Sequence, residues 1–536
     1  MNLKSKRESV LDKPAFVISV LLVLAISVPL IVVPEQATAV INAANAFVLK
    51  YFGSYYMFFG LLSLAVCAYI SFSKYGSIVL GGPDAKPEYK FLTWLAMNFC
   101  AGVGSGVVLW GATEWIYYYQ DAPLGVESMS NLAAEQATAY ANFHWGLIPC
   151  SFYVIGAAAV GYQLFVRKQN VLKLNEACSS VLGKHTNSFL GKLINLSFIF
   201  GLLGASATTL GLSTPMVAAA LSYVFGVEYS LKLQLISLVI VTAIFTTSVT
   251  LGMKKGIANL SNLNFIIMGL LLAITFFCGD TLFMVDNATT SLGYMMNNFF
   301  RMSTWMDPIG GSGFAQSWTV FYWAFYLGFA PFMALFYAKI SYGRTIRSML
   351  ITGILGGSLT YWLHQWILGG YGLSLQLSGK MDVVGNLASK SQGQTVVDIL
   401  ANLPGSKIVI LILGILCIIF LATQFDSAAY ILSTSTQKKL DKDGEPALWL
   451  RIFWAFMLFL LPVGFLVIGA PLDPLKTMVV VLSLPLSLVM ILTVWAFFKM
   501  VREDKNKGII TMKAPALYGL KLANREEKSK IVSEEK

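Results

Sequence analysis

Charged residues are scarce in this 536-residue chain, because Asp, Glu, Lys and Arg together make up only 12%. That is about half of the roughly 25% found in soluble domains. Hydrophobic residues make up 56%, and the mean hydropathy is +0.68. A soluble fold could not hide that much apolar surface from water. The composition therefore excludes a disordered chain and indicates a protein solvated mainly by lipid.

The chain is also poor in residues that bind metals or carry covalent catalysis. Its three histidines (144, 185 and 364) are scattered, and its six cysteines show neither a CxxC motif nor a metal-like Cys/His spacing. A membrane enzyme would need nucleophiles or metal ligands gathered within the bilayer. We therefore expect no disulfide framework and no resident cofactor, and we interpret the protein as something other than an enzyme.

Uninterrupted apolar runs of about 20 residues predict transmembrane helices. Twelve such runs occur, at 14–34, 52–73, 91–119, 139–166, 189–224, 233–252, 257–279, 315–340, 346–374, 406–436, 447–470 and 474–500. The first run is too long for the apolar core of a signal peptide and lacks a convincing cleavage site, so we keep it as a span. The fold class expected is an all-α, multi-span membrane protein.

Lysine and arginine predict the orientation of these spans, since cytoplasmic loops carry an excess of both. With both termini placed inside, 31 of the 38 basic residues fall on the inner side. We therefore expect a multi-pass protein of the plasma (inner) membrane with both termini cytoplasmic. The same distribution accounts for the net charge of +11 without a nucleic-acid partner.

Two acidic residues, Glu114 and Asp426, fall within predicted spans. An ionisable group inside a membrane is costly and marks a candidate functional site. The structural alternative is that Glu114 caps a helix break or bonds a backbone amide, and that Asp426 has a structural partner. The sequence leaves both alternatives open.

The third predicted span contains glycines at alternate positions, Gly102, Gly104 and Gly106. Each costs about 1 kcal/mol of helix propensity relative to alanine, and glycine allows the backbone to unwind and a ligand to approach it. Close helix packing is the alternative, but GxGxG fits that role less well than GxxxG. The pattern predicts a helix break.

The eighth predicted span is dense in aromatic residues between Trp318 and Phe332, and Gly328 and Pro331 predict a second break there. Phe325 and Phe329 lie at i and i+4, with Tyr326 beside them. Aromatic faces that converge on one point bind quaternary ammonium by cation–π attraction, about 0.5–2 kcal/mol per ring. The span therefore predicts a cage for such a cation.

Broken helices at matching points of two repeats are typical of secondary transporters. The third and eighth spans are five helices apart, which predicts two five-helix inverted repeats of the leucine-transporter type, preceded by two helices. The expected divisions are an inner tail (1–13), two additional spans with a loop (14–90), the first repeat (91–279), an outer loop (280–314), the second repeat (315–500) and an inner tail (501–536).

These residues resemble the betaine/carnitine/choline transporter family over nearly all of the hydrophobic chain. The matching motifs are Trp110-Gly111 with Glu114, Phe143-His144-Trp145, Lys255-Gly256 with Ser261-Asn262, and Trp318–Trp323 followed by Ile340-Ser341-Tyr342-Gly343-Arg344-Thr345. Within the family the chain looks most similar to the carnitine/γ-butyrobetaine exchanger. The resemblance implies a homotrimer.

The resemblance also implies the substrate position, between the third, fourth and eighth spans. The matching residues are Tyr117, Trp145, Tyr153, Phe325, Tyr326, Phe329 and Met333. The family commonly has tryptophan where this chain has Phe325 and Tyr326. Since tryptophan is the best cation–π partner, this departure favours a smaller or less strongly cationic substrate, or weaker binding.

For sodium-coupled members, the resemblance implies one ion beside the unwound third span. The matching positions are Cys100, Val103, Phe420, Thr423 and Gln424. A second sodium place uses two threonines of the fifth span, where this chain has Leu202 and Ser206, together with the ring of Phe332. Gln424 stands in place of a serine.

The sodium-independent exchanger has an arginine where Asn264 aligns and a methionine that matches Met333. The missing arginine favours Na⁺ as a coupling ion, whereas Leu202 and Gln424 weaken that interpretation. We expect a secondary transporter that carries a betaine-type quaternary-ammonium compound by alternating access with sodium coupling. The expected substrate class comprises glycine betaine, carnitine, γ-butyrobetaine and choline. The alternatives are a sodium-independent exchanger and a carrier of another small zwitterion.

Overall fold

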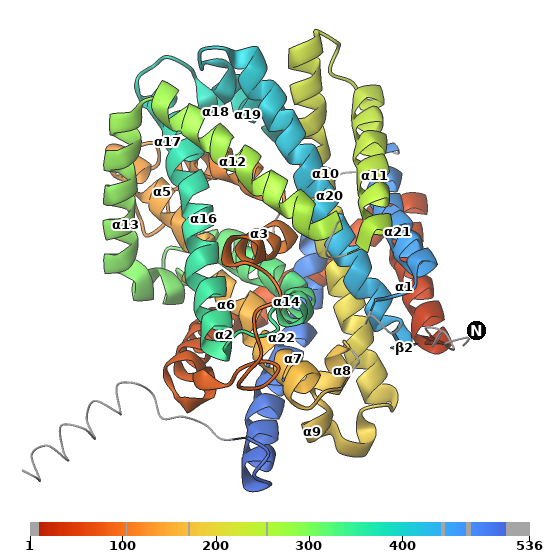
Figure 1. The fold of residues 1–536 in the computed structure, drawn as a ribbon. Helices are drawn as coiled ribbons and strands as arrows, with labels where there is room; N and C mark the ends of the chain where they lie inside the picture. The colour runs from red at the N-terminus through yellow and green to blue at the C-terminus, as the bar shows by residue number, and fades with distance from the viewer. Residues whose placement is uncertain are drawn as a thin grey trace, which may run out of the picture.

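The computed structural model describes residues 10–102, 104–169, 172–252, 256–440, 445–467 and 473–510. Nearly all of its regular structure is helical (Figure 1). The helices of the first half are α1(Lys13–Val32), α2(Pro34–Phe72), η1(Lys74–Ser77), α3(Phe91–Gly102), α4(Gly106–Gln120), α5(Asn131–His144), α6(Leu147–Ile155), α7(Ala157–Gly161), η2(Tyr162–Val166), α8(Leu174–Ala177), α9(Ser179–Leu182), η3(Gly183–His185), α10(Phe189–Phe225), α11(Leu231–Gly252) and α12(Ala258–Cys278). Those of the second half are α13(Thr281–Thr304), η5(Ala315–Val320), α14(Phe321–Ile340), α15(Ile346–Ile351), η6(Thr352–Gly356), α16(Gly357–His364), η7(Gln365–Gly369), α17(Gly370–Leu377), α18(Val383–Ser389), α19(Gln392–Ala401), α20(Ser406–Ser435), α21(Leu448–Val467) and α22(Asp473–Asn506).

The predicted spans agree with these helices. Among the described residues, eight helices are long and apolar enough to cross a bilayer, and the bent pair of α3 and α4 would be a ninth. The three remaining predicted runs coincide with α1, with the α15–α17 stretch and with α21. The all-α, multi-span fold class is confirmed, while the division into two five-helix repeats stays a prediction.

Segments predicted to lie on the inner side contact one another. A short antiparallel strand pair joins β1(Val10–Leu11) to β2(Gln437–Lys439), which follows α20 directly. Asp12 extends this contact, because its backbone N–H donates to Thr436 O at 3.0 Å and its carboxylate accepts from Lys173 Nζ at 2.9 Å. Sequence patterning did not predict these strands, which are too short to carry a period of two.

The last helix is fixed to the same side of the molecule. Arg167 donates from Nε and Nη2 to the two carboxylate oxygens of Asp504, at 2.8 and 2.9 Å. Tyr162 Oη donates to the same carboxylate at 2.9 Å, and Asp504 itself is 3% exposed. The end of α22 is thereby tied to the segment that follows η2.

The predicted outer loop contains the 24-residue helix α13. Its buried residues Met284, Ser291 and Met295 share one face, which packs against α5. Ser291 Oγ accepts from Asn142 Nδ2 at 3.1 Å. In Figure 1 this green helix lies at the edge of the molecule, beside α5.

Helix α14 lies inside the molecule and packs against α3, α6, α10, α20 and α22 (Figure 1). It runs without interruption from Phe321 to Ile340, with Pro331 inside it, so the predicted break at Gly328 and Pro331 is wrong. Gly328 serves close packing instead: a Cβ built on Gly201 of α10 would come within 3.0 Å of the Gly328 carbonyl oxygen. Small residues permit such close approach of membrane helices. Gly328 therefore serves helix packing rather than the helix break that the sequence predicts.

Candidate functional site

The candidate site begins at the break between α3 and α4. Helix α3 ends at Gly102, α4 begins at Gly106, and the two axes differ by 63°. Gly104 has a φ of +55°, a left-handed conformation that glycine adopts at little cost. The break that the alternating glycines predict is confirmed; Val103 lies outside the described residues.

Side chains from four other elements press on this break. A Cβ built on Gly102 would lie 3.1 Å from the Tyr153 ring, 3.2 Å from Met333 Cε and 3.4 Å from Tyr361 Oη. A Cβ on Gly104 would lie 2.2 Å from Gln424 Oε1. Gly104 is therefore required for its left-handed backbone conformation, and both glycines are required because neighbouring side chains leave little room for a Cβ.

Four aromatic rings gather beside the break. Tyr326 of α14 lies 4.9 Å from Tyr153 and 5.8 Å from Trp145, measured between ring centroids, and Trp145 lies 5.5 Å from Tyr361. Trp145 is edge-on to both tyrosines, and all four rings are buried to 3% exposure or less. The structure therefore brings together Trp145, Tyr153 and Tyr326 as predicted, and we call these three with Tyr361 the aromatic cluster.

The rings of Tyr117, Phe325 and Phe329, which were also predicted to line the cage, pair mainly with other aromatic residues. Tyr117 is half-buried, and its ring pairs with Trp318 at 5.1 Å. Phe325 and Phe329 pair with each other at 5.4 Å along a different line of α14, and Phe325 lies 6.2 Å from Tyr326. Phe325 and Phe329 lie on one face of α14, as their spacing of four residues predicts. Their other ring partners are Phe321 and Phe332 rather than Trp145.

Hydrogen bonds hold part of the cluster in place. Tyr153 Oη donates to the carbonyl oxygen of Gly102 at 3.2 Å, which satisfies a group that the broken helix leaves without an amide partner. Trp145 Nε1 donates to a carboxylate oxygen of Glu114. The Tyr326 hydroxyl, in contrast, is buried and has no hydrogen-bond partner.

The two acids in the spans have different surroundings. Glu114 bonds side chains rather than the backbone amide suggested by one interpretation of the sequence: it accepts from Tyr118 Oη at 2.6 Å and from Trp145. Asp426 accepts from Ser248 Oγ at 2.5 Å and lies 3.6 Å from Arg451 Nη2. Asp426 therefore has the structural partners that the alternative required.

Two of the predicted sodium residues, Thr423 and Gln424, lie on α20. Thr423 and Gln424 are buried, and both amide atoms of Gln424 lack a partner. With the amide of Asn264 oriented to satisfy its neighbours, it donates to Leu416 O at 3.3 Å and accepts from Phe420 N at 3.2 Å. Asn264 thus bonds backbone groups of α20 that lie about one and two turns before Thr423.

The other predicted sodium residues are also buried. Cys100 donates from Sγ to Ser261 O at 3.8 Å, so its side chain packs within the protein. Ser206 Oγ has no partner, and Phe332 is fully buried. Leu202, which replaces a threonine of the family, is also fully buried and offers no oxygen.

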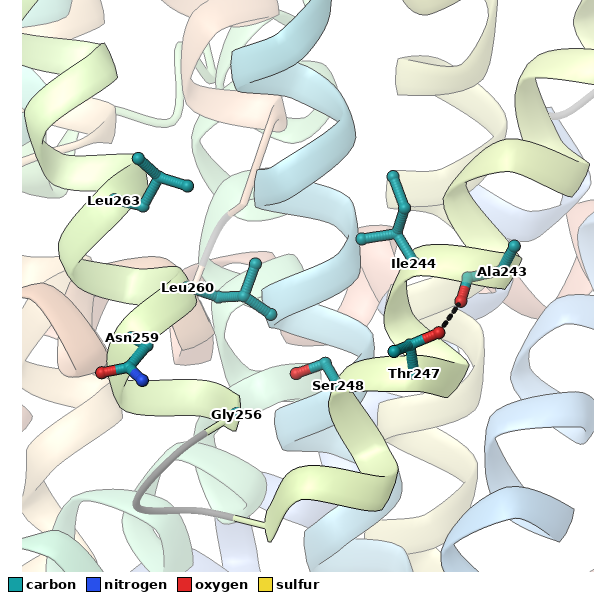
Figure 2. A pocket seen from close by; sticks show the side chains of 8 residues that line it. All are labelled: Ala243, Ile244, Thr247, Ser248, Gly256, Asn259, Leu260 and Leu263. Carbon is teal, nitrogen blue, oxygen red and sulfur yellow. Dashed lines mark hydrogen bonds between the residues drawn. The ribbon is translucent and has the colours of Figure 1, made fainter.

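A separate groove of about 520 Å³ opens between α11 and α12 (Figure 2). Its lining is mostly apolar, and Thr247 Oγ1 turns back to bond Ala243 O at 2.8 Å. Ser248 also lines it while donating to Asp426. None of the predicted substrate residues lines this groove.

Sequence reasoning missed Tyr361 and Tyr322 as neighbours of Trp145. Tyr322 lies 5.7 Å from Trp145 and stacks on His144 at 4.9 Å. Position 322 is one helical turn before Tyr326, and that spacing is a signal that could have placed its ring near Trp145. Tyr361 comes from a span whose helix alternates between α and π geometry, so no simple period points it at the cluster.

Comparisons with known proteins place the chain in a family. The family model "BCCT, betaine/carnitine/choline family transporter" matches residues 14–506. A carnitine transporter of Acinetobacter baumannii is 31% identical, with 84% of this chain and 82% of that protein covered. The glycine betaine transporter OpuD of Bacillus subtilis is 31% identical (89% and 92% covered), as is the uncharacterized transporter YeaV of Escherichia coli (83% and 92%).

Among solved structures, a substrate-bound, outward-open sodium-coupled sialic acid symporter matches with a TM-score of 0.48 at 10% identity, covering 84% of this chain and 86% of that one. That likeness is too slight to support an argument. The family match spans all twelve predicted membrane segments, and the residues of the helix break and the aromatic cluster fall within its range. The chain therefore belongs to the betaine/carnitine/choline transporter family.

Proposed function

We propose that this protein transports a betaine-type quaternary-ammonium compound by alternating access, and that the aromatic cluster binds the trimethylammonium group. The observation that carries the proposal is the aromatic cluster beside the break, in which Tyr326 packs on Trp145 and Tyr153 and the ring of Tyr153 lies against Gly102. Helix breaks supply free backbone groups at the middle of a transporter. Aromatic rings supply attraction for a cation that has no N–H to donate.

The hydroxyl of Tyr326, at the edge of the cluster, suits the carboxylate end of a betaine-type substrate. Tyr326 Oη is a donor without a partner, whereas the family commonly has tryptophan at this position. A buried hydroxyl left unbonded costs about 1–3 kcal/mol. A carboxylate or hydroxyl on the substrate would recover that free energy, which favours betaine or carnitine over choline-like cations with a single weak acceptor.

We infer further that transport is coupled to sodium. Gln424 Oε1 lies against the broken backbone with no partner, and Ser105 Oγ is likewise buried without one. Oxygen donors of this kind are what a small hard cation requires. Thr423, Gln424 and the carbonyls of Cys100 and Phe420 would hold the ion, and Asn264 brings no fixed positive charge to compete with it.

A second sodium place has weaker support. Ser206 supplies an oxygen, but Leu202 removes one of the two hydroxyls that the family uses, leaving the ring of Phe332 as the other partner. We therefore propose one coupling ion, near Gln424. By family resemblance we also propose a homotrimer.

Binding is the first test. Purified protein is titrated with γ-butyrobetaine, carnitine, glycine betaine and choline while its tryptophan fluorescence is recorded. We expect quenching by at least one trimethylammonium compound, and Tyr326→Ala should weaken that binding by about 1–2 kcal/mol. A folded sample that responds to none of them would favour a carrier of another small zwitterion.

Coupling is the second test. In proteoliposomes, uptake should rise with an inward sodium gradient, and Thr423→Ala should reduce this dependence. The rival function is sodium-independent exchange, which is favoured by Leu202 and by Met333. Uptake that ignores sodium but requires substrate inside the vesicle would establish the exchanger.

A further inference from the structure

A buried chain of hydrogen bonds leads from Thr319 to Glu114. Thr319 Oγ1 lies 3.0 Å from His144 Nε2, His144 Nδ1 lies 2.7 Å from Tyr118 Oη, and Tyr118 Oη lies 2.6 Å from Glu114 Oε1. The four side chains come from η5, α5 and α4, and each is 1% exposed or less. Glu114 connects this chain to the proposed substrate position, because it accepts a hydrogen bond from Trp145 of the aromatic cluster.

The direction of each bond follows from counting protons. Tyr118 has one hydroxyl proton, and ionised Glu114 can only accept, so that proton points to Glu114. His144 must then donate from Nδ1 to Tyr118 Oη, which leaves Nε2 as an acceptor for the Thr319 hydroxyl. With Glu114 ionised, every proton in the chain points toward the carboxylate.

The groups around Glu114 leave its negative charge incompletely compensated. The basic group that faces it within the described residues is His144, whose Nδ1 lies 3.7 Å from Oε1. The others are neutral donors, namely Trp145, Gln365 at 3.4 Å and Tyr118. A carboxylate buried in a membrane protein without a cation is costly, so uptake of a proton would relieve it.

Two further titratable groups lie beside the chain, and one of them, Tyr322, also interacts with Glu114 and Tyr118 through its hydroxyl. Tyr322 of α14 stacks on the His144 ring, and Tyr140 of α5 lies 5.7 Å from it. The Tyr140 hydroxyl is buried and has no hydrogen-bond partner. The proton path is therefore defined by Thr319, His144, Tyr118 and Glu114.

We propose that these four residues form a proton-binding chain that adjusts the substrate site through Trp145. One solvent proton binds His144 Nε2, the Nδ1 proton moves to Tyr118 Oη, and the Tyr118 proton moves to Glu114. The result is a neutral carboxylic acid, a neutral tyrosine and a neutral imidazole of the other tautomer. Every hydrogen bond in the chain reverses direction, and one proton has been gained.

The effect on the substrate site follows from the second oxygen of Glu114. Trp145 Nε1 donates to it, and the Trp145 ring forms one wall of the aromatic cluster. A hydrogen bond to a charged acceptor is roughly twice as strong as one to a neutral acceptor, and protonation also removes a negative charge near the bound cation. Acidification should therefore weaken substrate binding, by roughly fivefold on the hydrogen-bond term alone.

Infrared spectroscopy tests the proton site without any ligand. As the pH of the purified protein is lowered, a carbonyl stretch of a protonated carboxylic acid should appear, and Glu114→Gln should abolish it. Tyr118→Phe should shift the apparent pKa of that band because it cuts the chain, whereas Tyr140→Phe is the matched control that should not. A band that persists in Glu114→Gln, or that is missing from the wild type, overturns the proposal.

Substrate binding then tests the link to Trp145, which rests on the proposed function. We expect affinity for γ-butyrobetaine to fall on acidification in the wild type and to be independent of pH in Glu114→Gln. If no trimethylammonium compound binds at any pH, the substrate assignment fails while the infrared result still decides the proton site. An infrared band with pH-independent binding would refute the link. Should Glu114→Gln fail to fold, Tyr118→Phe should shift the pH at which both the band and the affinity change, and Tyr140→Phe should shift neither.

Discussion

Gly104→Ala tests the break most directly, because it should affect two quantities that can be measured separately. These are the free energy of unfolding and the affinity for sodium. At a φ of +55° an alanine costs about 1–2 kcal/mol of folding free energy. Its Cβ would also lie 2.2 Å from Gln424 Oε1. Since that oxygen ends a flexible side chain, Gln424 should rotate away at little further cost in stability. The displaced oxygen is the proposed sodium ligand.

Gly125→Ala supplies the matched control. Gly125 has a φ of +75°, and a Cβ built on it meets nothing within 4 Å. Both substitutions should therefore lower the unfolding free energy of the purified protein by a similar amount. Only Gly104→Ala should raise the sodium concentration that gives half-maximal uptake, by about tenfold or more, since a contact to a charged group contributes about 1.5–3 kcal/mol.

A double substitution checks the cause. In Gly104→Ala with Gln424→Ser the shorter side chain avoids the new Cβ, so sodium dependence should partly recover while the loss of stability remains. Equal sodium dependence in Gly104→Ala and Gly125→Ala would refute the assignment of Gln424 as a ligand. A much larger loss of stability in Gly104→Ala would show that Gln424 cannot move aside.

Three other substitutions probe the packing that supports the site. Tyr153→Phe should lower the unfolding free energy by about 1 kcal/mol, because it leaves the last carbonyl of α3 unbonded; an unchanged thermal transition in detergent would contradict this. Gly328→Leu should cost about 1–3 kcal/mol and reduce uptake, whereas Gly293→Leu, which faces open space, should do neither. Arg167→Gln should release the end of α22, seen as faster hydrogen exchange there, and unchanged exchange would count against that anchor.

Much of the fold could be predicted because a bilayer imposes strict rules on sequence. Apolar length marks each span, and alternating glycines at 102, 104 and 106 mark a break, since few other patterns lower helix propensity so strongly in three alternate positions. Gly328 and Pro331 also lower helix propensity, but helix α14 continues through both residues. At Gly328 the helix continues, and the glycine allows α10 to pack closely at Gly201, a residue distant in sequence. The local sequence alone does not reveal that contact.

The candidate site was predictable only in part, because many of its contacts join elements that are distant in sequence. Trp145, Tyr153 and Tyr326 were found through family resemblance and aromatic density, and they lie together. Tyr361 was missed because π-helical segments on both sides of α16 change which face each residue presents. The partners of Glu114 come from separate elements, so no spacing along one helix reveals the chain of bonds.

The central claim is that aromatic rings at the break attract a positive charge. Binding of γ-butyrobetaine is compared with binding of 5,5-dimethylhexanoate, which has the same shape but a neutral carbon in place of the ammonium nitrogen, in the wild type and in Tyr326→Leu. The account predicts that the wild type prefers the ammonium compound and that this preference shrinks in Tyr326→Leu, by about 0.5–2 kcal/mol. Equal affinity for the two compounds in the wild type, or a preference that Tyr326→Leu leaves intact, would contradict it.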